Sequence, residues 1–512
     1  MRFLAAFALS CYGILHGFDR IRFRGTQRHL AYVFGFDQFL HHKARVQLKD
    51  FADYTKSTSQ RLCQRIEAQA RQQGIEPHYV ELSSTSKEEL AAKLAKKAGR
   101  SDGLIAVLKA LEPCSTFEVR KDHDLGRLAL KPRVAKCLHY YHYWLDPRLG
   151  PCHVRLQTWF PFHVFACVNG REMLAQQMTA AGMKFRQRDN CFSWIENLTR
   201  AQAMMNEQLR MDWSRELTRL LTASHPDWRE WPGMERDYYW SAEQTEWASD
   251  VMFRSQQELK ALMPSFIHHA MTTLDSSQVM KFLGHHINKT GTVNDNFRGE
   301  VGTDVTRRPE GTRVAFRVKR NGVKFYDKQG SVLRVETTLN EVNDFKSYRP
   351  SEGEPEGTKQ WRPMKKGVSD LPRRAEVSQQ ANERCLDSLA SVVPTQTVAE
   401  TLKRVSRRRK KDAVTMRALN VHGEDHELLK IIAQGKFMLN GFRNRDVRAG
   451  LGSDVSASAV SYRLRLLRHH EVIRKVSGTH RYQVTAKGRE LLVALTKAQE
   501  IPAPEENRET PP

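Results

Sequence analysis

The fold of this chain is best decided by residues 456–489, which read SASAVSYRLRLLRHHEVIRKVSGTHRYQVTAKGR. Apolar residues recur at helical spacing at Val460, Leu464 and Leu467, so the first half of the stretch is predicted to form a helix with one face toward a core. Two short strand patterns follow, and Gly478 between them is typical of the tight turn of a hairpin. The stretch therefore predicts a helix followed by a β-hairpin.

Two more helix patterns precede this stretch, at 426–435 and 442–451. With a helix at 456–470 and strands at 472–476 and 480–485, the order is three helices and then a hairpin. That order is typical of a winged helix-turn-helix, in which the third helix lies in the major groove of DNA. The sequence therefore predicts a C-terminal winged helix.

Candidate contacts to DNA lie on the polar face of the third helix, in the hairpin and in a basic run at 403–411. Polar and basic side chains there can reach base edges or phosphates, and Arg465 can bond bidentately to a guanine. The basic run predicts an arm that follows the DNA backbone. The predicted nucleic-acid contacts are Ser458, Ser461, Tyr462, Arg465, Lys475, Thr479, His480, Arg481, Arg407, Arg408, Arg409 and Lys410.

The same segment resembles winged-helix proteins of the MarR-like type. The likeness is carried by the apolar spacing of the third helix, by Gly478-Thr479 in the turn, by Tyr482-Gln483-Val484-Thr485 and by Lys487-Gly488-Arg489. It implies duplex DNA as the partner. Winged helices also bind RNA or other proteins, and these remain alternatives.

Charge supports a polyanionic partner. The chain of 512 residues has 82 Lys and Arg against 58 Asp and Glu, a formal net charge of +24. Residues 401–495 hold 21 basic and 8 acidic residues, so the surplus is concentrated around the predicted winged helix. Basic surfaces that neutralise phosphates release counterions, although a membrane surface would also attract them. No Gly-rich phosphate loop follows a predicted strand, which argues against a nucleotide-binding class.

Cysteine usage and the N-terminus bear on the compartment. The eight cysteines are scattered and include no CxxC pair, which suits a reducing cytosol. The apolar run at 3–15 leads directly into a strand pattern at 18–23 and lacks a signal-peptide cleavage site. No run reaches the roughly 18 apolar residues of a membrane span. We therefore expect a cytoplasmic protein without a membrane partner, and a homodimer is possible.

The fold class predicted for the remainder is an α/β (α+β) multidomain body, because strand and helix patterns alternate along it. The predicted segments are an α/β domain at 1–130, an aromatic and His-rich strand–helix–strand unit at 131–200, a helical segment at 201–275, a β-rich basic segment at 276–350, a linker and basic arm at 351–412, the winged helix at 413–498 and a disordered tail at 499–512.

The strongest catalytic candidate lies in a predicted strand–turn–strand unit. Tyr326, Asp327 and Lys328 end the first strand, and Arg334 and Glu336 share one face of the second at period two. The turn would bring Asp327 near that face.

This unit resembles the Tyr-Asp-Lys…Leu-Arg-x-Glu segment of phage and plasmid replication initiators, which nick DNA. The resemblance implies a Mg²⁺ or Mn²⁺ site at Asp327 and Glu336, Lys328 on phosphate and Tyr326 as nucleophile. The His-hydrophobic-His metal motif of such nickases is absent, because His153-Val154-Arg155 has arginine in the second position. The alternative interpretation, which we favour, is a basic hairpin with an ion pair.

Two further donor sets are candidates for metal binding. Asp295, Glu300 and Asp304 could add to a Mg²⁺ site, although spread carboxylates are usually surface charge. Cysteines and histidines at 137–167 supply enough donors for zinc, but their spacing fits no familiar site. Buried aromatics with hydrogen-bonded histidines are the preferred interpretation. The donors are Cys137, His139, His142, Cys152, His153, His163 and Cys167.

The leading functional hypothesis is a nucleic-acid-binding protein, associated with a mobile element or with replication, that is targeted to DNA by the winged helix. One alternative is a metal-dependent DNA nickase or nuclease. Another is a non-catalytic RNA-binding or transcription-regulatory protein, which would stack bases on aromatics at 140–144 and 159–162. The Leu-His-Tyr-Tyr and Tyr-Asp-Lys segments also resemble those of a widespread family of uncharacterised bacterial proteins, a likeness that implies no activity.

Overall fold

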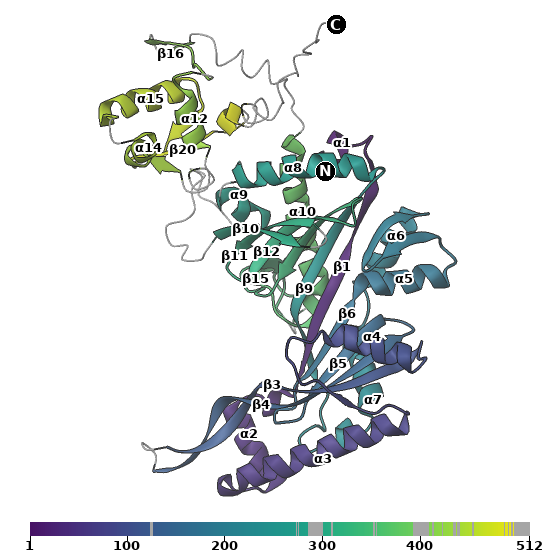
Figure 1. Cartoon of the computed structure of the whole chain (residues 1–512). Coiled ribbons are helices and arrows are strands. Elements are labelled where there is room, and N and C mark those ends of the chain that lie inside the picture. The colour runs from purple at the N-terminus through teal and green to yellow at the C-terminus, as the bar shows by residue number, and fades with distance from the viewer. Residues whose placement is uncertain are drawn as a thin grey trace, which may run out of the picture. The chain divides into compact units, whose positions relative to one another are not determined.

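The computed structural model places the chain in two compact units, each assembled from distant segments (Figure 1). The first unit comprises residues 1–11, 253–333 and 383–512, and the second comprises residues 12–252 and 334–382. The structure describes residues 1–122, 126–272, 274, 276–284, 301–308, 311–351, 354, 356–392, 409–411, 414–421, 423–433, 437, 441–452, 455–485, 487–489, 491–492 and 495.

The second unit is built on a sheet whose strands lie in the order β13-β9-β1-β6-β5-β4-β3-β2. The pairs from β1 through β6, β5 and β4 to β3 are antiparallel, whereas β2 joins β3 in parallel. The strands are β1 (Cys11–Thr26), β2 (His78–Tyr79), β3 (Gly103–Asp122), β4 (Arg127–Asp146), β5 (Gly150–Gln157), β6 (Val164–Asn169), β9 (Tyr239–Phe253) and β13 (Val332–Leu339). The predicted α/β class is thereby confirmed for the body.

Helices cover both faces of this sheet. Leu62 of α3 and Leu217 of α7 pack into one core with Val107 and Tyr140, while α4 packs over Leu108 in a separate core on the other side. The helices of the unit are α2 (Val33–Gln38), α3 (Phe51–Gln72), α4 (Lys87–Lys97), α5 (Gly170–Ala180), α6 (Leu198–Glu207), α7 (Trp213–Ser224) and α10 (Leu371–Leu389), with short turns η1 (Arg28–Leu30), η2 (Phe39–Ala44), η3 (Leu48–Asp50), η4 (Trp228–Glu230) and η5 (Val368–Asp370).

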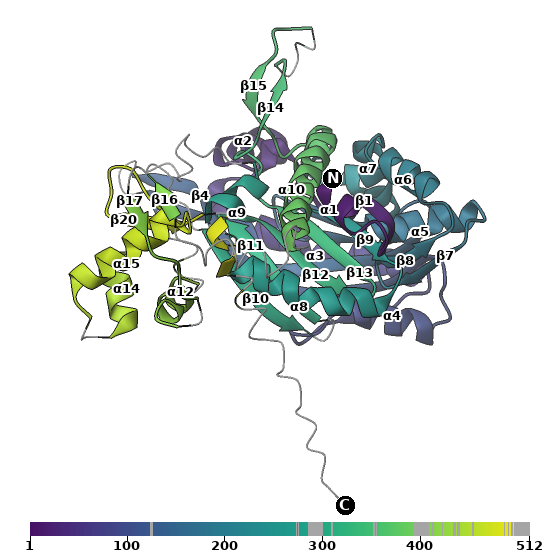
Figure 2. The same cartoon turned by 90° about the horizontal axis from the view of Figure 1, so that it is seen from above.

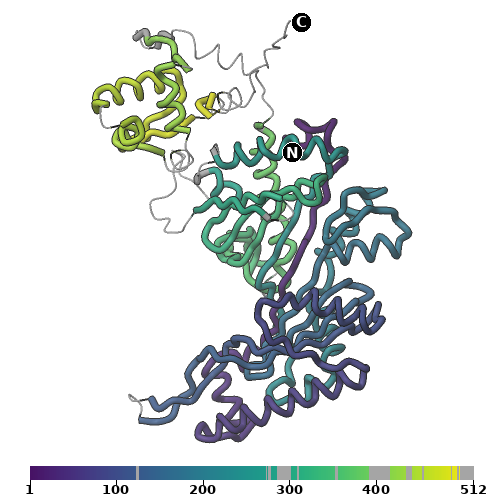
Figure 3. Tube along the Cα trace, in the orientation of Figure 1, coloured from purple at the N-terminus to yellow at the C-terminus, as the bar shows by residue number. Residues whose placement is uncertain are grey.

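Three hairpins complete the second unit. The tube trace in Figure 3 shows the β3–β4 hairpin reaching out as a narrow ribbon from the rest of its unit. The other two are small antiparallel pairs. They are formed by β7 (Phe185–Arg188) with β8 (Cys191–Ile195) and by β14 (Lys346–Arg349) with β15 (Gln360–Pro363).

The helical prediction for 201–275 is wrong over β9, which is a strand of 15 residues. Its side chains are buried on both faces from Thr245 to Phe253, so no alternation of polar and apolar residues marks it as a strand. Within the strand–helix–strand unit predicted at 131–200, the aromatic run at 137–144 belongs to β4, and residues 152–168 are shared between β5 and β6.

The first unit contains a meander of β10 (Val301–Arg308), β11 (Gly311–Val318) and β12 (Asn321–Lys328). Its helices include α1 (Arg2–Ala6), α8 (Gln256–Thr272) and α9 (Ser276–Phe282), with the turn η6 (Ala390–Val392). The β-rich segment predicted at 276–350 contains these three strands and β13.

The C-terminal part of the first unit has its own hydrophobic core. Its helices are α12 (His426–Ile432), α14 (Asn444–Leu451) and α15 (Ala457–His469), and its strands are β16 (Arg409–Lys411), β17 (Val414–Met416), β18 (Phe442–Arg443), β19 (Ile473–Lys475) and β20 (Arg481–Val484). β20 pairs with both β18 and β19. The three helices and the hairpin predicted here are confirmed as elements, and the predicted tail at 499–512 lies outside the described residues.

Among the described residues, no helix combines the length and the apolar character needed to cross a membrane.

Candidate metal centre

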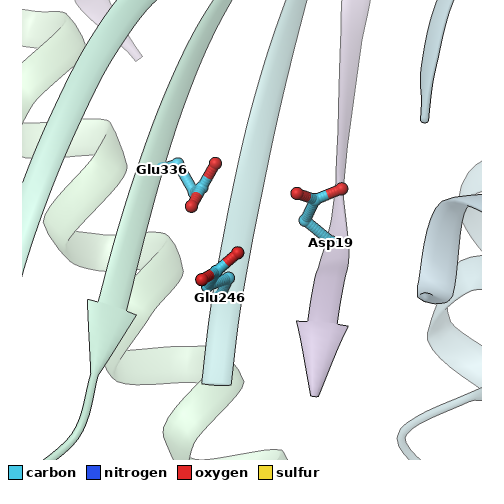
Figure 4. A group of neighbouring side chains, drawn as sticks. All are labelled: Asp19, Glu246 and Glu336. Atoms are coloured by element: carbon cyan, nitrogen blue, oxygen red, sulfur yellow. The ribbon is translucent and has the colours of Figure 1, made fainter. Parts of the chain in front are cut away.

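Three carboxylates from neighbouring strands meet inside the second unit. They are Asp19 on β1, Glu246 on β9 and Glu336 on β13, and one oxygen of each lies within 4.8 Å of the others. Figure 4 shows the three side chains turned toward one another between the strands. Only 6%, 6% and 1% of the respective residues are exposed, so the acids sit in a poorly solvated place.

A buried salt bridge between Arg334 and Asp250 lies beside the three carboxylates and helps to position them. Arg334 donates from Nε and Nη2 to the two carboxylate oxygens of Asp250, at 2.6 and 2.9 Å. Both side chains are completely buried. Its Nη1 lies 3.2 Å from Oδ1 of Asp19, so one guanidinium joins β13 to both β9 and β1. Because Arg334 and Glu336 are two residues apart on a strand, they share a face, as the sequence predicted.

A second buried arginine reaches the same aspartate from α5. Asn169 caps this helix by accepting from the backbone N–H groups of Arg171 and Glu172. Arg171 Nη2 lies 3.2 Å from Asp250 and also donates to the carbonyl of Ala248 at 3.0 Å. Burial lowers the pKa of Arg171, and the charge of Asp250 opposes that shift. Asp250 thus holds two guanidinium groups.

A close approach between α5 and β1 supports this arrangement. A Cβ at Gly170, the first residue of α5, would lie 2.4 Å from the carbonyl oxygen of Phe18 and 2.8 Å from Gln208. Any larger residue would push the helix away from the strand that carries Asp19.

The remaining partners of the acids lie toward solvent. Asn190 donates to Asp19 at 2.5 Å, and Arg20 donates to Glu246 at 2.6 Å. Burial would lower the pKa of Arg20, but the hydrogen bond and charge of Glu246 outweigh it and the pKa is raised. The Arg20 side chain is 40% exposed, whereas that of Glu246 is 8% exposed.

Carboxylate oxygens are the ligands that Mg²⁺ and Mn²⁺ prefer, and three of them at this spacing can share one ion. Since Asp19 and Glu246 also accept from Asn190 and Arg20, their orientation is fixed before any ion binds. Chemically, such a centre can hold a phosphodiester oxygen and a water molecule on one ion.

The predicted catalytic residues do not form one group. Glu336 belongs to the cluster, while Asp327 does not. Asp327 Oδ1 instead accepts from the N–H of Gly330 at 2.9 Å in the turn after β12, and burial raises its pKa against that hydrogen bond. Tyr326 is half-buried on β12, where Lys324 lies 6.0 Å from its ring.

The other predicted donor sets do not bring metal ligands together. Asp304 on β10 faces Arg317 at 3.7 Å, and Asp295 and Glu300 lie outside the described residues. The cysteines and histidines at 137–167 form no ligand group among the residues searched, which are the described ones. Burial lowers the pKa of His142 to about 3, which is the behaviour of a neutral core histidine.

Most of the predicted base-stacking aromatics are core residues. Tyr140 and Phe160 are fully buried, and Tyr141, Tyr143 and Phe162 are nearly so. Alternation along β4 sends Tyr140 into one core and Tyr141 into the other. These five rings cannot stack on bases without unfolding. Trp144 and Trp159 are partly exposed, and for them the stacking at 140–144 and 159–162 stays a prediction.

The predicted DNA contacts on the third helix and hairpin are all at the surface. The side chains of Ser458, Ser461, Tyr462, Arg465, Lys475, Thr479, His480 and Arg481 are exposed. Arg407 and Arg408 lie outside the described residues. For Arg409 and Lys410 the structure describes the backbone, which forms part of β16.

Asp19 and Glu246 were missed by the sequence prediction. The available signal was an acidic residue beside a large aromatic or aliphatic one, as in Phe18-Asp19 and Glu246-Trp247, but both strands carry other charged residues that dilute it. Buried charges need partners, and such partners mark functional sites more often than chance.

Comparison of the chain with protein-family models, with curated proteins and with solved structures finds no match.

Proposed function

We propose that this protein binds DNA, that α12 to β20 form a winged helix-turn-helix, and that α15 is its recognition helix. One observation carries the proposal: α15 buries Val460, Leu464 and Leu467 while Arg465 and Tyr462 are exposed. The helix therefore presents a polar, basic face to a ligand, as major-groove readers do.

The elements around α15 support the same function. Ser456 caps the helix by accepting from the N–H of Ala459 at 3.2 Å. Asn444, at the start of α14, donates to Ser461 at 2.8 Å and ties the two helices of the turn together. Lys475 and Arg481 are exposed on the hairpin that follows and would form the wing against the DNA backbone.

The test is duplex binding by the full chain, using duplexes selected from a random pool. Arg465→Ala should relax the sequence preference and weaken the selected duplex by roughly 1–3 kcal/mol, since a bidentate base contact is lost. Arg210→Ala removes the same charge from an exposed arginine of the second unit and should leave the preference intact. An unchanged preference in Arg465→Ala would refute α15 as the reader.

A second candidate function is metal-dependent cleavage of a phosphodiester bond in DNA. The cluster of Asp19, Glu246 and Glu336 favours it, because a buried set of three carboxylates suits the metal ions that such reactions use. It modifies the predicted nickase site, because Glu336 is retained while Asp19 and Glu246 replace Asp327 as ligands.

This candidate is tested with supercoiled and single-stranded DNA in the presence of Mg²⁺ or Mn²⁺. Glu246→Gln and Glu336→Gln should each abolish cleavage while Asp327→Asn, which keeps the acceptor for Gly330, should retain it. Cleavage that survives both glutamine variants would eliminate the site. Isothermal calorimetry with Mn²⁺ alone tests whether the centre binds metal even if no DNA is cut.

A further inference from the structure

The hairpin of β14 and β15 exposes two aromatic side chains that face each other. Tyr348 and Trp361 are direct partners in the antiparallel register, and their ring centroids lie 5.7 Å apart. They are 59% and 68% exposed. Figure 2 shows this ribbon standing out from the rest of the second unit.

Such exposure is unusual for this protein. All nine tryptophans lie among the described residues, and Trp361 is the only one that is mostly exposed. Leaving two adjoining rings in water forgoes the free energy of burying them, so a ligand that covers them is expected to bind there.

The hairpin is firmly held at its base. On the face opposite to Tyr348, Arg349 is buried, lies 3.5 Å from Asp370 and donates to the carbonyl of Pro363 at 3.3 Å. The N–H of Met364 donates to the carbonyl of Phe345 at 2.8 Å, and both side chains are buried. The two rings are thus displayed on a fixed support and lose little freedom on binding.

The charge around the rings fits a phosphate chain. Alternation along the strands puts Lys346 on the face of Tyr348, and Lys359 precedes Trp361 by the same two residues. Both lysines are exposed, and neither has an ion pair within the part of the chain that the structure describes. Glu354 and Glu356 in the connecting loop would repel a polyanion. Base stacking should therefore contribute more to the binding free energy than contacts to phosphates.

We infer that Tyr348 and Trp361 form a stacking platform for unpaired bases of single-stranded nucleic acid, with Lys346 and Lys359 beside the backbone. Flat rings accept every base because each base has a π face, so the site should bind with little sequence preference. The inference extends the proposed function to unpaired strands and uses none of the residues of α15 or of the carboxylate cluster.

The experiment measures the affinity of the full chain for a labelled oligothymidine by fluorescence anisotropy. Trp361→Ala and Tyr348→Ala should each weaken binding by roughly tenfold, the scale of one lost base–aromatic stack. Trp361→Phe and Tyr348→Phe keep a ring and should retain most of the affinity. Tyr79→Ala removes an exposed ring of β2 and serves as the matched control, with no change expected.

Three outcomes would overturn the platform. The first is an absence of oligothymidine binding by the native chain, and the second is an affinity in both alanine variants equal to that of the native chain. The third is a dimer that dissociates in Trp361→Ala, which would identify a second copy as the occupant. Affinity for the selected duplex separates this inference from the winged-helix proposal, because the Trp361 variants should keep that affinity and Arg465→Ala should weaken it. A comparison of oligothymidine with oligouridine shows whether the bound strand can be RNA.

Discussion

At the scale of single residues, the second unit depends on charges that water does not reach. Arg334 and Asp250 are completely buried, and Arg171 and Asp19 are drawn to the same pair. Such pairs add little net stability relative to apolar side chains, but losing one member leaves the other charge without compensation. In this unit the buried ion pairs hold in place the strands that carry the carboxylate cluster.

Arg334→Met should lower the free energy of unfolding of the second unit by up to about 3–5 kcal/mol, because the buried charge of Asp250 loses its bidentate partner and keeps only Arg171. All nine tryptophans belong to this unit, so tryptophan fluorescence in urea reports its unfolding selectively. Arg210→Met at an exposed ion pair should cost less than about 1 kcal/mol. Equal losses in the two variants would mean that the buried pair has no special role.

At the scale of elements, a close backbone contact explains why Thr485 and Gly488 stand three residues apart after the hairpin of β19 and β20. Thr485 Oγ1 accepts from the N–H of Gly488 at 3.0 Å, and a Cβ at Gly488 would lie 2.0 Å from the carbonyl oxygen of Val472. This closure sets how the chain leaves β20.

Gly488→Ala should destabilise the C-terminal core and reduce duplex binding, because Val472 and the hairpin must move to admit the methyl group. Gly478→Ala is the matched control: the turn glycine has a positive φ of 70° but open space around its Cβ, so about 1 kcal/mol of backbone strain is expected. Circular dichroism melting and duplex affinity check both variants. A milder effect at Gly488 than at Gly478 would contradict the closure.

Elements with a clear period were predictable, and buried ones were not. α15 follows from its apolar spacing. β13 is an exception among the buried strands, because the turn at Gly330 beside it marks where it begins. β9 was hidden, since burial on both faces removes the alternation that identifies a strand. The carboxylate cluster was also not predicted from the sequence. Asp19 and Glu246 become neighbours only through strand order, which local patterns do not encode.

At the scale of the whole molecule, buried histidines couple the second unit to pH. Burial lowers the pKa of several of them far below the ordinary value of 6.5. The pKa falls to about 4 for His139, His153 and His225, and to about 3 for His142 and His163.

Between pH 6.5 and about 4, the unfolded chain binds protons at these histidines that the folded unit does not, so stability should fall as the pH falls through that window. Each such histidine contributes at most about 1.4 kcal/mol per pH unit. Urea unfolding followed by tryptophan fluorescence at pH 7 and pH 5 measures the loss. His142→Leu should make it smaller, and an identical loss in that variant would exclude His142 as a contributor.

The strand order also has a consequence for how the protein is made. β1 and β9 are synthesised first, and their partner Arg334 is added only when β13 follows. Until that point, Asp19 and Asp250 lack the guanidinium that joins them in the finished sheet. A nascent chain on the ribosome would thus keep this region open until translation has passed β13, and a truncated product ending earlier would carry an unfinished, charge-exposed edge.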